Sequence, residues 1–294
     1  MISTINKDIK VWNFINHQLY DTSIILKGHQ QNVYCLVYSK ISQWFISGGF
    51  DQNIIIWKQI NEQQWESTCI CNSGSEVFNF YLNKNEDQLF SSHLDGSIKI
   101  WLVSKDLNSL SLNQTLHKHK KQVGQISINE EESQMVSCSS DKKIIIWEQD
   151  NNKKWQFKYF VNKTVDDSGE RIIYLDKDTI TWKQIQKGII HIFHQENNIF
   201  VEKKDQQINL KAIEFADYMC LCPFIFNRKK QILIIKHHNY MNIFKYENSQ
   251  LTQIEEPIQF ENFSFFGNLT QDGKFLVIWI SQQHLYRVYQ LFQD

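Results

Sequence analysis

Two groups of residues in this chain combine the side chains of a serine hydrolase triad. They are His29, Ser47 and Asp51, followed by His119, Ser137 and Asp141. In a hydrolase, a Ser hydroxyl attacks the substrate, a His takes its proton, and an Asp orients the His. One nucleophile is enough for that chemistry, whereas here the set occurs twice at the same spacing. The recurrence therefore favours a structural role over a catalytic one.

A repeating unit contains both groups. Three segments align without a gap, and they span residues 33–57, 77–101 and 123–147. Each begins with Val, carries Ser ten residues before a closing Trp, and carries Asp six residues before it. The closing Trp57, Trp101 and Trp147 are 44 and 46 residues apart, and Trp12 lies 45 residues before the first. Such a period is typical of repeat folds.

The residues of each unit predict β structure. Val33 to Tyr38 is rich in β-branched and aromatic residues, and a polar turn and an apolar run from Trp44 to Ile46 follow. The third run, Ile54 to Trp57, is apolar throughout, which is typical of a strand buried on both faces. A more polar stretch around Gln64 to Ile70 would form the edge. Because one such unit cannot bury both faces alone, the pattern predicts sheets stacked in a closed ring.

Together these residues resemble the blades of WD-repeat β-propeller proteins. The resemblance rests on Leu26-Lys27-Gly28-His29, Ser47 to Asp51, and Ile54 to Trp57, and it is strong over residues 1–150. The family's Gly-His pair is intact only at Gly28-His29. Its Trp-Asp dipeptide is absent, because the four Trp residues are followed by Asn13, Lys58, Leu102 and Glu148.

The resemblance implies a buried hydrogen-bond relay in each clear blade. The Trp indole N–H donates to Ser, Ser to His, and His to Asp, which ties the loop before the first strand to the turn before the third. The first and third blades carry the relays His29, Ser47, Asp51, Trp57 and His119, Ser137, Asp141, Trp147. The middle blade carries Ser91, Asp95 and Trp101, with Ser73 in the position of the His.

Divergent apolar runs continue through residues 151–294 and fit three more blades. Trp182 falls in a predicted second strand, so it is not a repeat Trp. A partial unit at residues 1–25 supplies only the tail of a second strand, a third and a fourth. We therefore expect an all-β propeller of four-stranded blades, forming one domain over residues 1–294. It would have six full or nearly full blades and a partial N-terminal one, in a seven-position ring.

The sequence leaves two alternatives for how this ring closes. The last unit lacks a fourth strand. Either the N-terminal strands close the ring with the C-terminal unit, or the chain is truncated relative to an ancestral form. We expect a seven-position ring with an incomplete closing blade.

The resemblance also places partner-binding positions on one face of the propeller. They flank the Val that begins each first strand, and they precede the turn Asp. The expected residues are Asn32, Tyr34, Phe50, Glu76, Phe78, Leu94, Gln122, Gly124 and Ser140. Tyr34, Phe50, Phe78 and Leu94 would form an apolar patch of the kind that marks a protein-binding site. In the alternative interpretation, Tyr34 and Phe78 only pack against neighbouring blades.

Composition limits the partners and the compartment. The 294 residues carry 31 Lys and Arg against 32 Asp and Glu, so the net charge is −1. This balance argues against nucleic acid or an anionic membrane surface as the main partner. We find no run of 18 apolar residues, no secretory signal in MISTINKDIKVW, and too few cysteines for a disulfide framework. We expect a cytoplasmic protein without membrane insertion or a small-molecule substrate.

Metal and cofactor motifs are weak. The pairs Cys69/Cys71 and Cys220/Cys222 offer two thiols each, whereas a zinc site needs about four ligands, so small buried hydrophobes are expected. The pairs His191/His194 and His237/His238 lack carboxylate companions at ligand spacing, which favours solvated or satisfied histidines. We expect no metal and no cofactor.

Two classes of function follow. A non-catalytic scaffold or adaptor would hold other proteins, within a multi-subunit complex. The alternative within this class rests on Trp57…Trp65 and Trp147…Trp155, a pattern similar to the WD-repeat subunit of cytosolic iron–sulfur protein assembly. A ubiquitin-ligase receptor is disfavoured, because Trp-Asp-x-Arg is missing after every repeat Trp. A propeller enzyme would need carboxylates or His at the channel mouth, where the expected residues are mostly apolar or amide.

Overall fold

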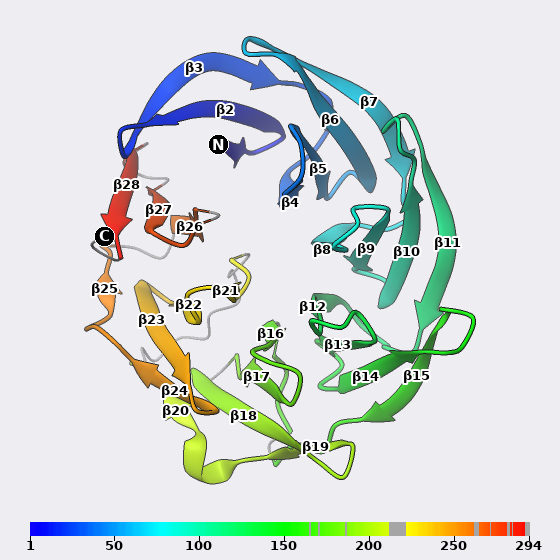
Figure 1. Cartoon of the computed structure of the whole chain (residues 1–294), viewed down its shortest axis with the longest axis vertical. Coiled ribbons are helices and arrows are strands. Elements are labelled where there is room, and N and C mark those ends of the chain that lie inside the picture. Colours follow the sequence, from blue (N-terminus) through cyan, green and yellow to red (C-terminus); the bar gives the residue numbers. More distant parts are fainter. Residues whose placement is uncertain are drawn as a thin grey trace. The chain divides into compact units, whose positions relative to one another are not determined.

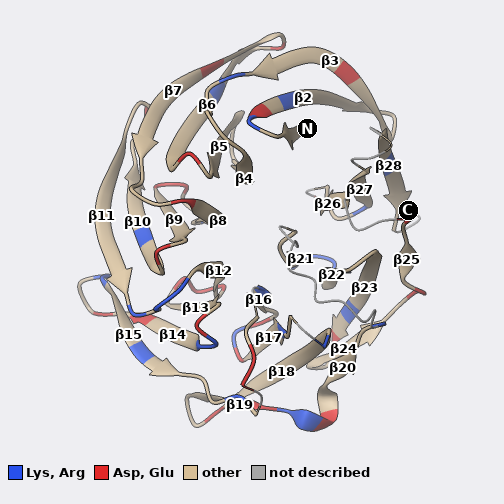
Figure 2. Ribbon diagram, turned by 180° about the vertical axis from the view of Figure 1, so that it is seen from behind, with Lys and Arg blue, Asp and Glu red and all other residues tan. Residues whose placement is uncertain are grey.

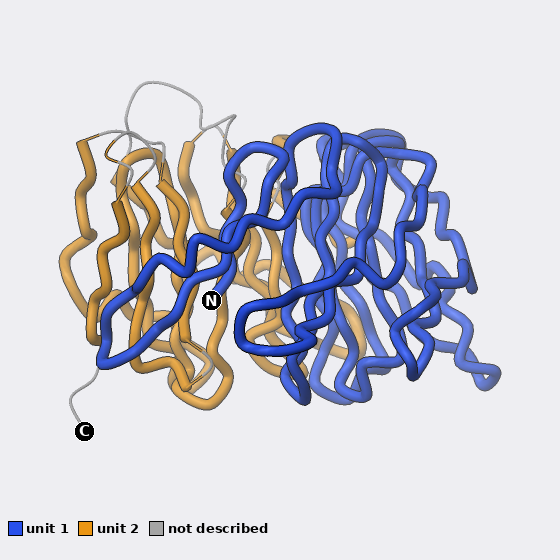
Figure 3. Tube along the Cα trace, turned by 90° about the horizontal axis from the view of Figure 1, so that it is seen from above, with its two compact units in different colours: residues 1–160 blue, residues 161–294 orange. Residues whose placement is uncertain are grey.

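The chain folds almost entirely into short antiparallel strands (Figure 1). The computed structural model describes residues 1–164, 166–169, 171–185, 187–211, 222–261, 265–270, 272–280, 283 and 285–291. The chain divides into two compact units, which are Met1–Phe160 and Val161–Asp294 (Figure 3). Their boundary lies close to residue 150, where the sequence changes from clear to divergent repeats. That one domain spans residues 1–294 stays a prediction.

The first unit consists of four antiparallel sheets, in which each strand pairs with its sequence neighbours. The first sheet has three strands, β1 (Ile2–Ile5), β2 (Asp8–Ile15) and β3 (Gln18–Leu26). The second sheet contains β4 (Val33–Tyr38), β5 (Trp44–Gly49), β6 (Asn53–Asn61) and β7 (Gln64–Asn72). The third sheet contains β8 (Val77–Leu82), β9 (Gln88–His93), β10 (Ser97–Val103) and β11 (Leu110–His117). The fourth sheet contains β12 (Val123–Ile128), β13 (Gln134–Ser139), β14 (Ile144–Gln149) and β15 (Trp155–Phe160).

The second unit has three sheets with the same topology. The fifth sheet contains β16 (Arg171–Tyr174), β17 (Thr179–Lys183), β18 (Ile189–Glu196) and β19 (Ile199–Glu202), and β20 (Ile208–Asn209) also pairs with β18. The sixth contains β21 (Ile225–Asn227), β22 (Ile232–His237), β23 (Tyr240–Glu247) and β24 (Gln250–Gln253), and β25 (Ile258–Gln259) pairs with β23. The seventh contains β26 (Phe265–Leu269), β27 (Phe275–Ile280) and β28 (Leu285–Gln290).

These sheets confirm the expected fold class and blade count. Seven sheets correspond to the six full or nearly full units and the partial one, and the first and last sheets have three strands each. Trp182 lies in β17, the second strand of its sheet, as predicted. A short 3₁₀ turn, η1 (Lys204–Gln206), is the one helix among the described residues. None of the described helices has the length and apolar character needed to span a membrane.

Side chains of the third strands alternate between the two neighbouring sheets. In β6, Ile54 belongs to a core cluster with Phe80 of the third sheet, whereas Trp57 belongs to a cluster with Ile9 of the first sheet. This alternation confirms the predicted burial on both faces. Complete burial of each such Ile contributes roughly 2 kcal/mol.

The second unit packs by the same rule. In β22, the second strand of its sheet, Leu233 joins a core cluster with Leu175, which follows β16, and Ile234 joins a cluster with Ile278 of the seventh sheet. The repeat signature has been lost here, but the period-two alternation of apolar residues has not. That alternation is what holds consecutive sheets together within each unit.

Candidate functional site

The second sheet contains a relay that is closed by His29. Trp57 Nε1 donates to Ser47 Oγ over 2.8 Å, and Ser47 Oγ lies 2.7 Å from His29 Nε2. His29 Nδ1 lies 2.9 and 3.0 Å from the two carboxylate oxygens of Asp51. Because a carboxylate only accepts, Nδ1–H donates to Asp51, and in the neutral imidazole Nε2 accepts the Ser47 proton. The side chain of Ser47 is fully buried.

The fourth sheet repeats this arrangement. Ser137 Oγ lies 2.8 Å from both Trp147 Nε1 and His119 Nε2, and His119 Nδ1 lies 3.0 Å from Asp141 Oδ2. The carboxylate of Asp141 also accepts the main-chain N–H of Lys120 over 2.8 Å and of Lys143 over 2.9 Å. Burial would raise the pKa of Asp141, but these hydrogen bonds, led by that from His119, lower it to about 2. The group is therefore anionic at neutral pH.

The third sheet departs from the expected relay, and the assignment of Ser73 to the His position is wrong. His93, at the end of β9, takes that position. Its Nε2 lies 2.8 Å from Ser91 Oγ, which also accepts from Trp101 Nε1 over 2.8 Å. Its Nδ1 lies 3.2 Å from the main-chain oxygen of Ser75, an acceptor, so Nδ1 carries the proton. Burial is the main cause that lowers the pKa of His93 to about 4, and this side chain is neutral at pH 7.

Serine side chains hold the loop before β8 in place of the loop His of the other two sheets. Ser73 Oγ lies 2.8 Å from the main-chain oxygens of Gln52 and Ser75. Asp95 bonds the N–H of Ser97 over 2.9 Å and its hydroxyl over 2.6 Å, so its carboxylate serves the turn and not an imidazole. The sequence contains a signal for this change, since Ser91 and His93 are two residues apart on one strand and share a face.

Main-chain hydrogen bonds beside the relays hold the backbone of the expected partner-binding residues in place. In each sheet, the residue before the turn Asp donates its N–H to the carbonyl of the residue before the first-strand Val. The pairs are Phe50 to Asn32 (2.9 Å), Leu94 to Glu76 (3.1 Å) and Ser140 to Gln122 (3.0 Å). After the Asp, the turn needs a left-handed residue, which is Gln52 (φ 64°), Gly96 (φ 86°) or Lys142 (φ 67°).

In β4, β8 and β12, a β-bulge lies at the residue that follows the first Val, which is one of the expected partner-binding positions. The register moves from Val33–Gly49 to Cys35–Gly48, which leaves Tyr34 as the extra residue. Phe78 and Gly124 are the extra residues at the equivalent bulges of β8 and β12. Because a bulge re-aims a side chain out of the regular pleat, the sheets themselves set the direction of Tyr34 and Phe78.

Three of the expected residues form an aromatic patch, which we define as Tyr34, Phe50 and Phe78. The ring of Tyr34 stacks on Phe78 at 5.4 Å between centroids and meets Phe50 edge-on at 6.0 Å. Tyr34 and Phe78 are half-buried, and Phe50 is 42% exposed. Burial, followed by the nearby Glu76 carboxylate, raises the pKa of Tyr34, so its hydroxyl keeps its proton. Leu94, the fourth expected member, is 41% exposed on the equivalent loop of the third sheet.

Metal-ligand sets do not occur among the described residues, where no three His, Cys, Asp or Glu side chains gather as a metal site would require. Cys69 and Cys71 pack against the core cluster of the second and third sheets, and Cys220 lies outside the described residues. The expectation that His191 lacks a carboxylate companion is wrong. Pairing of β18 with β19 brings Glu202 Oε1 to 2.6 Å from its Nδ1, so His191 is a satisfied buried histidine.

Comparison with solved structures identifies the fold. A chain in a crystal structure of the mitotic checkpoint complex matches 99% of this chain and 86% of its own length, with a TM-score of 0.75 and 14% identity. At that identity, the likeness shows the fold alone. The family model for the WD domain, G-beta repeat, matches residues 21–58 and 110–148. The chain has the fold of a β-propeller, and these two segments match the WD repeat.

Curated relatives match less than half of this chain. The F-box-like/WD repeat-containing protein TBL1X of Homo sapiens is 26% identical over 148 residues, which are 46% of this chain and 25% of that protein. Protein tipD of Dictyostelium discoideum is 20% identical over 123 residues, which are 41% of this chain and 19% of that protein. The match thus spans a quarter or less of these relatives.

Proposed function

We propose that this propeller is a non-catalytic scaffold that binds protein partners through the aromatic patch. The observation that carries the proposal is the contact of Tyr34 with both Phe50 and Phe78. The rings are held by bulges and by a main-chain hydrogen bond, so little conformational entropy is lost when a partner binds. Aromatic side chains held in this way supply most of the binding energy at protein interfaces.

The remaining expected residues of the same loops would form the rim of this interface. Four of them are polar, and Leu94 adds an apolar contact. The five residues are Asn32, Glu76, Leu94, Gln122 and Ser140. Each belongs to one of the three main-chain pairs described above. Rim residues contribute mainly by excluding water from the central contacts.

Burial of the relay supports the non-catalytic part of the proposal. Ser47, Ser91 and Ser137 are each fully buried. Each hydroxyl also bonds a Trp N–H and a His nitrogen, as described above. A nucleophile must reach its substrate, and these hydroxyls have no exposed surface from which to attack.

Affinity purification with mass spectrometry tests the scaffold proposal. The test protein is the double variant Phe50→Asp, Phe78→Asp, which places two charges in the patch. The control is Ile70→Asp, Leu112→Asp, because these side chains are 59% and 53% exposed on the outer strands β7 and β11. We expect the patch variant to lose most wild-type partners and the control to keep them. An unchanged partner list for a folded patch variant would refute the proposal.

The iron–sulfur assembly alternative has weaker support, because its aromatic pattern has a packing explanation. Trp65 lies 5.3 Å from Phe45, and Trp155 lies 5.6 Å from Phe90, between ring centroids. Both Trp residues therefore cover core aromatics of their own or a neighbouring sheet. Co-recovery of iron–sulfur proteins in the same purification would favour this alternative. Cytoplasmic location and membership of a multi-subunit complex belong to the proposal, and the list of recovered partners tests the second.

A further inference from the structure

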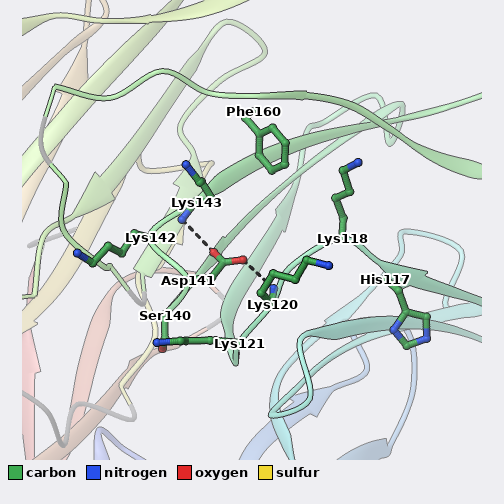
Figure 4. Close-up of a pocket in the computed structure, with 9 residues that line it drawn as sticks. All are labelled: His117, Lys118, Lys120, Lys121, Ser140, Asp141, Lys142, Lys143 and Phe160. Atoms are coloured by element: carbon green, nitrogen blue, oxygen red, sulfur yellow. Dashed lines mark hydrogen bonds between the residues drawn. The ribbon is translucent and has the colours of Figure 1, made fainter.

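A pocket of about 650 Å³ opens on the fourth sheet, between the loop before β12 and the turn that joins β13 to β14 (Figure 4). Its lining is strongly cationic. Five lysines contribute to it, with Phe160 from the end of β15, and they are Lys118, Lys120, Lys121, Lys142 and Lys143. Figure 2 shows both segments as positively charged loops beside largely uncharged inner strands.

Asp141, the one carboxylate in the described lining, offsets only one of these five positive charges. Its oxygens are engaged by His119 and by the main-chain N–H groups of Lys120 and Lys143, as Figure 4 shows for the latter two. In the described part of the chain, the ammonium groups of Lys118, Lys120, Lys121 and Lys143 have no ion pair. The chain as a whole has a net charge of −1, so this concentration of positive charge is local.

Several lysines that line one cavity suit a phosphate monoester. A phosphorylated Ser or Thr carries about −1.5 to −2 charges at pH 7 and three strong acceptor oxygens. A carboxylate side chain carries one charge and would leave most of the lysines unbalanced. Lys acts as a point charge toward phosphate and does not demand the planar geometry of an Arg site.

The walls of the pocket suit a peptide. The Lys118 ammonium lies 4.3 Å from the ring centroid of Phe157 and 5.8 Å from that of Phe160, so aromatic surface adjoins the charge. Ser140 also lines the pocket, and its N–H bonds Gln122 in the third main-chain pair. The pocket is therefore continuous with the loops of the proposed partner-binding face.

We propose that this pocket binds a phosphoserine or phosphothreonine side chain of a protein partner. The inference rests on the proposed scaffold function and specifies the chemistry of the partner. A single pocket can hold one terminal phosphate, whereas duplex DNA presents a line of charges, about one per 1.7 Å of helix axis, and needs a track of cations. The lysines here surround a single cavity.

Fluorescence anisotropy with the full chain tests the proposal. The probes are two fluorescein-labelled degenerate peptide libraries, one with a fixed central phosphoserine and one with serine at that position. The pocket variant is Lys120→Gln, Lys121→Gln, Lys143→Gln. The control is Lys58→Gln, Lys84→Gln, Lys105→Gln, which changes the net charge equally at exposed lysines outside the pocket. We expect the wild type and the control to bind the phosphoserine library at least tenfold more tightly, and inorganic phosphate to compete.

The pocket variant should lose at least tenfold in affinity for the phosphoserine library while its melting temperature stays close to that of the control. Equal affinity of the wild type for both libraries would overturn the proposal, as would full retention of binding by the pocket variant. Tighter binding of a labelled single-stranded oligonucleotide than of the phosphoserine library would overturn it in favour of nucleic acid. The Phe50→Asp, Phe78→Asp variant keeps the pocket, so loss of its partners tests the scaffold separately.

Discussion

Ser91 Oγ lies 2.8 Å from Nε2 of His93, two residues further along the same strand. In the second and fourth sheets, the His that meets the relay Ser comes from the loop before the first strand. In the third sheet, the imidazole comes from β9 itself, and the same Trp–Ser–His contacts form without the Asp. The Ser hydroxyl thus still links the Trp indole to an imidazole, but the His that supplies the imidazole lies on a strand and not in the preceding loop.

Neighbouring serines on β9 give the first prediction. Ser91 and Ser92 are both fully buried. Ser91 Oγ joins Trp101 to His93, whereas Ser92 Oγ has no hydrogen-bond partner in the described structure. Ser91→Ala leaves a donor and an acceptor unsatisfied and should cost about 2 to 4 kcal/mol of unfolding free energy. Ser92→Ala removes an unpaired hydroxyl and should be neutral or slightly stabilising.

Urea unfolding of the two serine variants at pH 7 measures this difference. Each variant is the control for the other, because the residues are adjacent and the substitution is the same. Equal losses of stability would show that the Ser91 contacts contribute nothing beyond burial.

The buried imidazole of His93 predicts a pH dependence. Its pKa falls from 6.5 to about 4 in the folded chain, mainly through burial. Between these values the unfolded chain binds more protons, so the unfolding free energy decreases as the pH falls from about 6.5 to 4. The loss should approach about 3 kcal/mol, because each pKa unit corresponds to about 1.4 kcal/mol.

A His93→Gln variant isolates this contribution, since every other titrating group is common to both proteins. The difference in unfolding free energy between wild type and variant should shrink by about 3 kcal/mol from pH 7 to pH 4. Above pH 7 it should be constant. A difference that stays constant down to pH 4 would mean that the imidazole titrates normally in the folded state.

Sequence patterns predicted the sheets better than the details of the site. The spacing of Val, Ser, Asp and Trp located all three clear blades, because each marks a fixed place in one strand or turn. The spacing of Ser91 and His93 indicated that the two could meet on one strand face, but the contact of His93 Nδ1 with the Ser75 carbonyl depends on the fold of the loop before β8. Glu202 was missed as a partner of His191 for the same reason, because residues eleven apart meet only when β19 folds back on β18.

The aromatic patch was predictable in part. The family resemblance placed Tyr34, Phe50 and Phe78 on one binding face, which stays a prediction, and in the structure the ring of Tyr34 lies against both phenylalanines. The bulges that direct Tyr34 and Phe78 could not be foreseen, because a bulge depends on the register between two strands. The lysine pocket was missed as well. Its lysines lie in two segments of the sequence, residues 118–121 and 142–143, and only the fold brings both segments to one cavity.

Protonation of Asp141 in the fourth sheet should lower the unfolding free energy at a lower pH than protonation of His93 does. Hydrogen bonds, led by that from His119, lower the folded-state pKa of Asp141 from 3.8 to about 2 against the opposing effect of burial. The stabilisation is therefore complete above pH 3.8 and is lost as the pH falls through about 2. We expect a loss of about 1 to 2 kcal/mol, allowing for partial contact with water. Urea unfolding from pH 5 to pH 2 should show this loss in the wild type and not in Asp141→Asn, and parallel curves would refute it.

Two tryptophans separate the contribution of the relay from that of ring packing. Trp101 and Trp182 are 3% and 1% exposed, so substitution by Phe removes similar buried bulk from each. Trp101 Nε1 donates to Ser91, whereas Trp182 Nε1 is buried without a hydrogen-bond partner in the part of the chain that the structure describes. Trp101→Phe should therefore cost about 1 to 2 kcal/mol more unfolding free energy than Trp182→Phe, because only the first loses a hydrogen bond. Urea unfolding of both variants measures the difference. Equal losses would mean that the hydrogen bond from Trp101 to Ser91 adds nothing to the stability that ring packing provides.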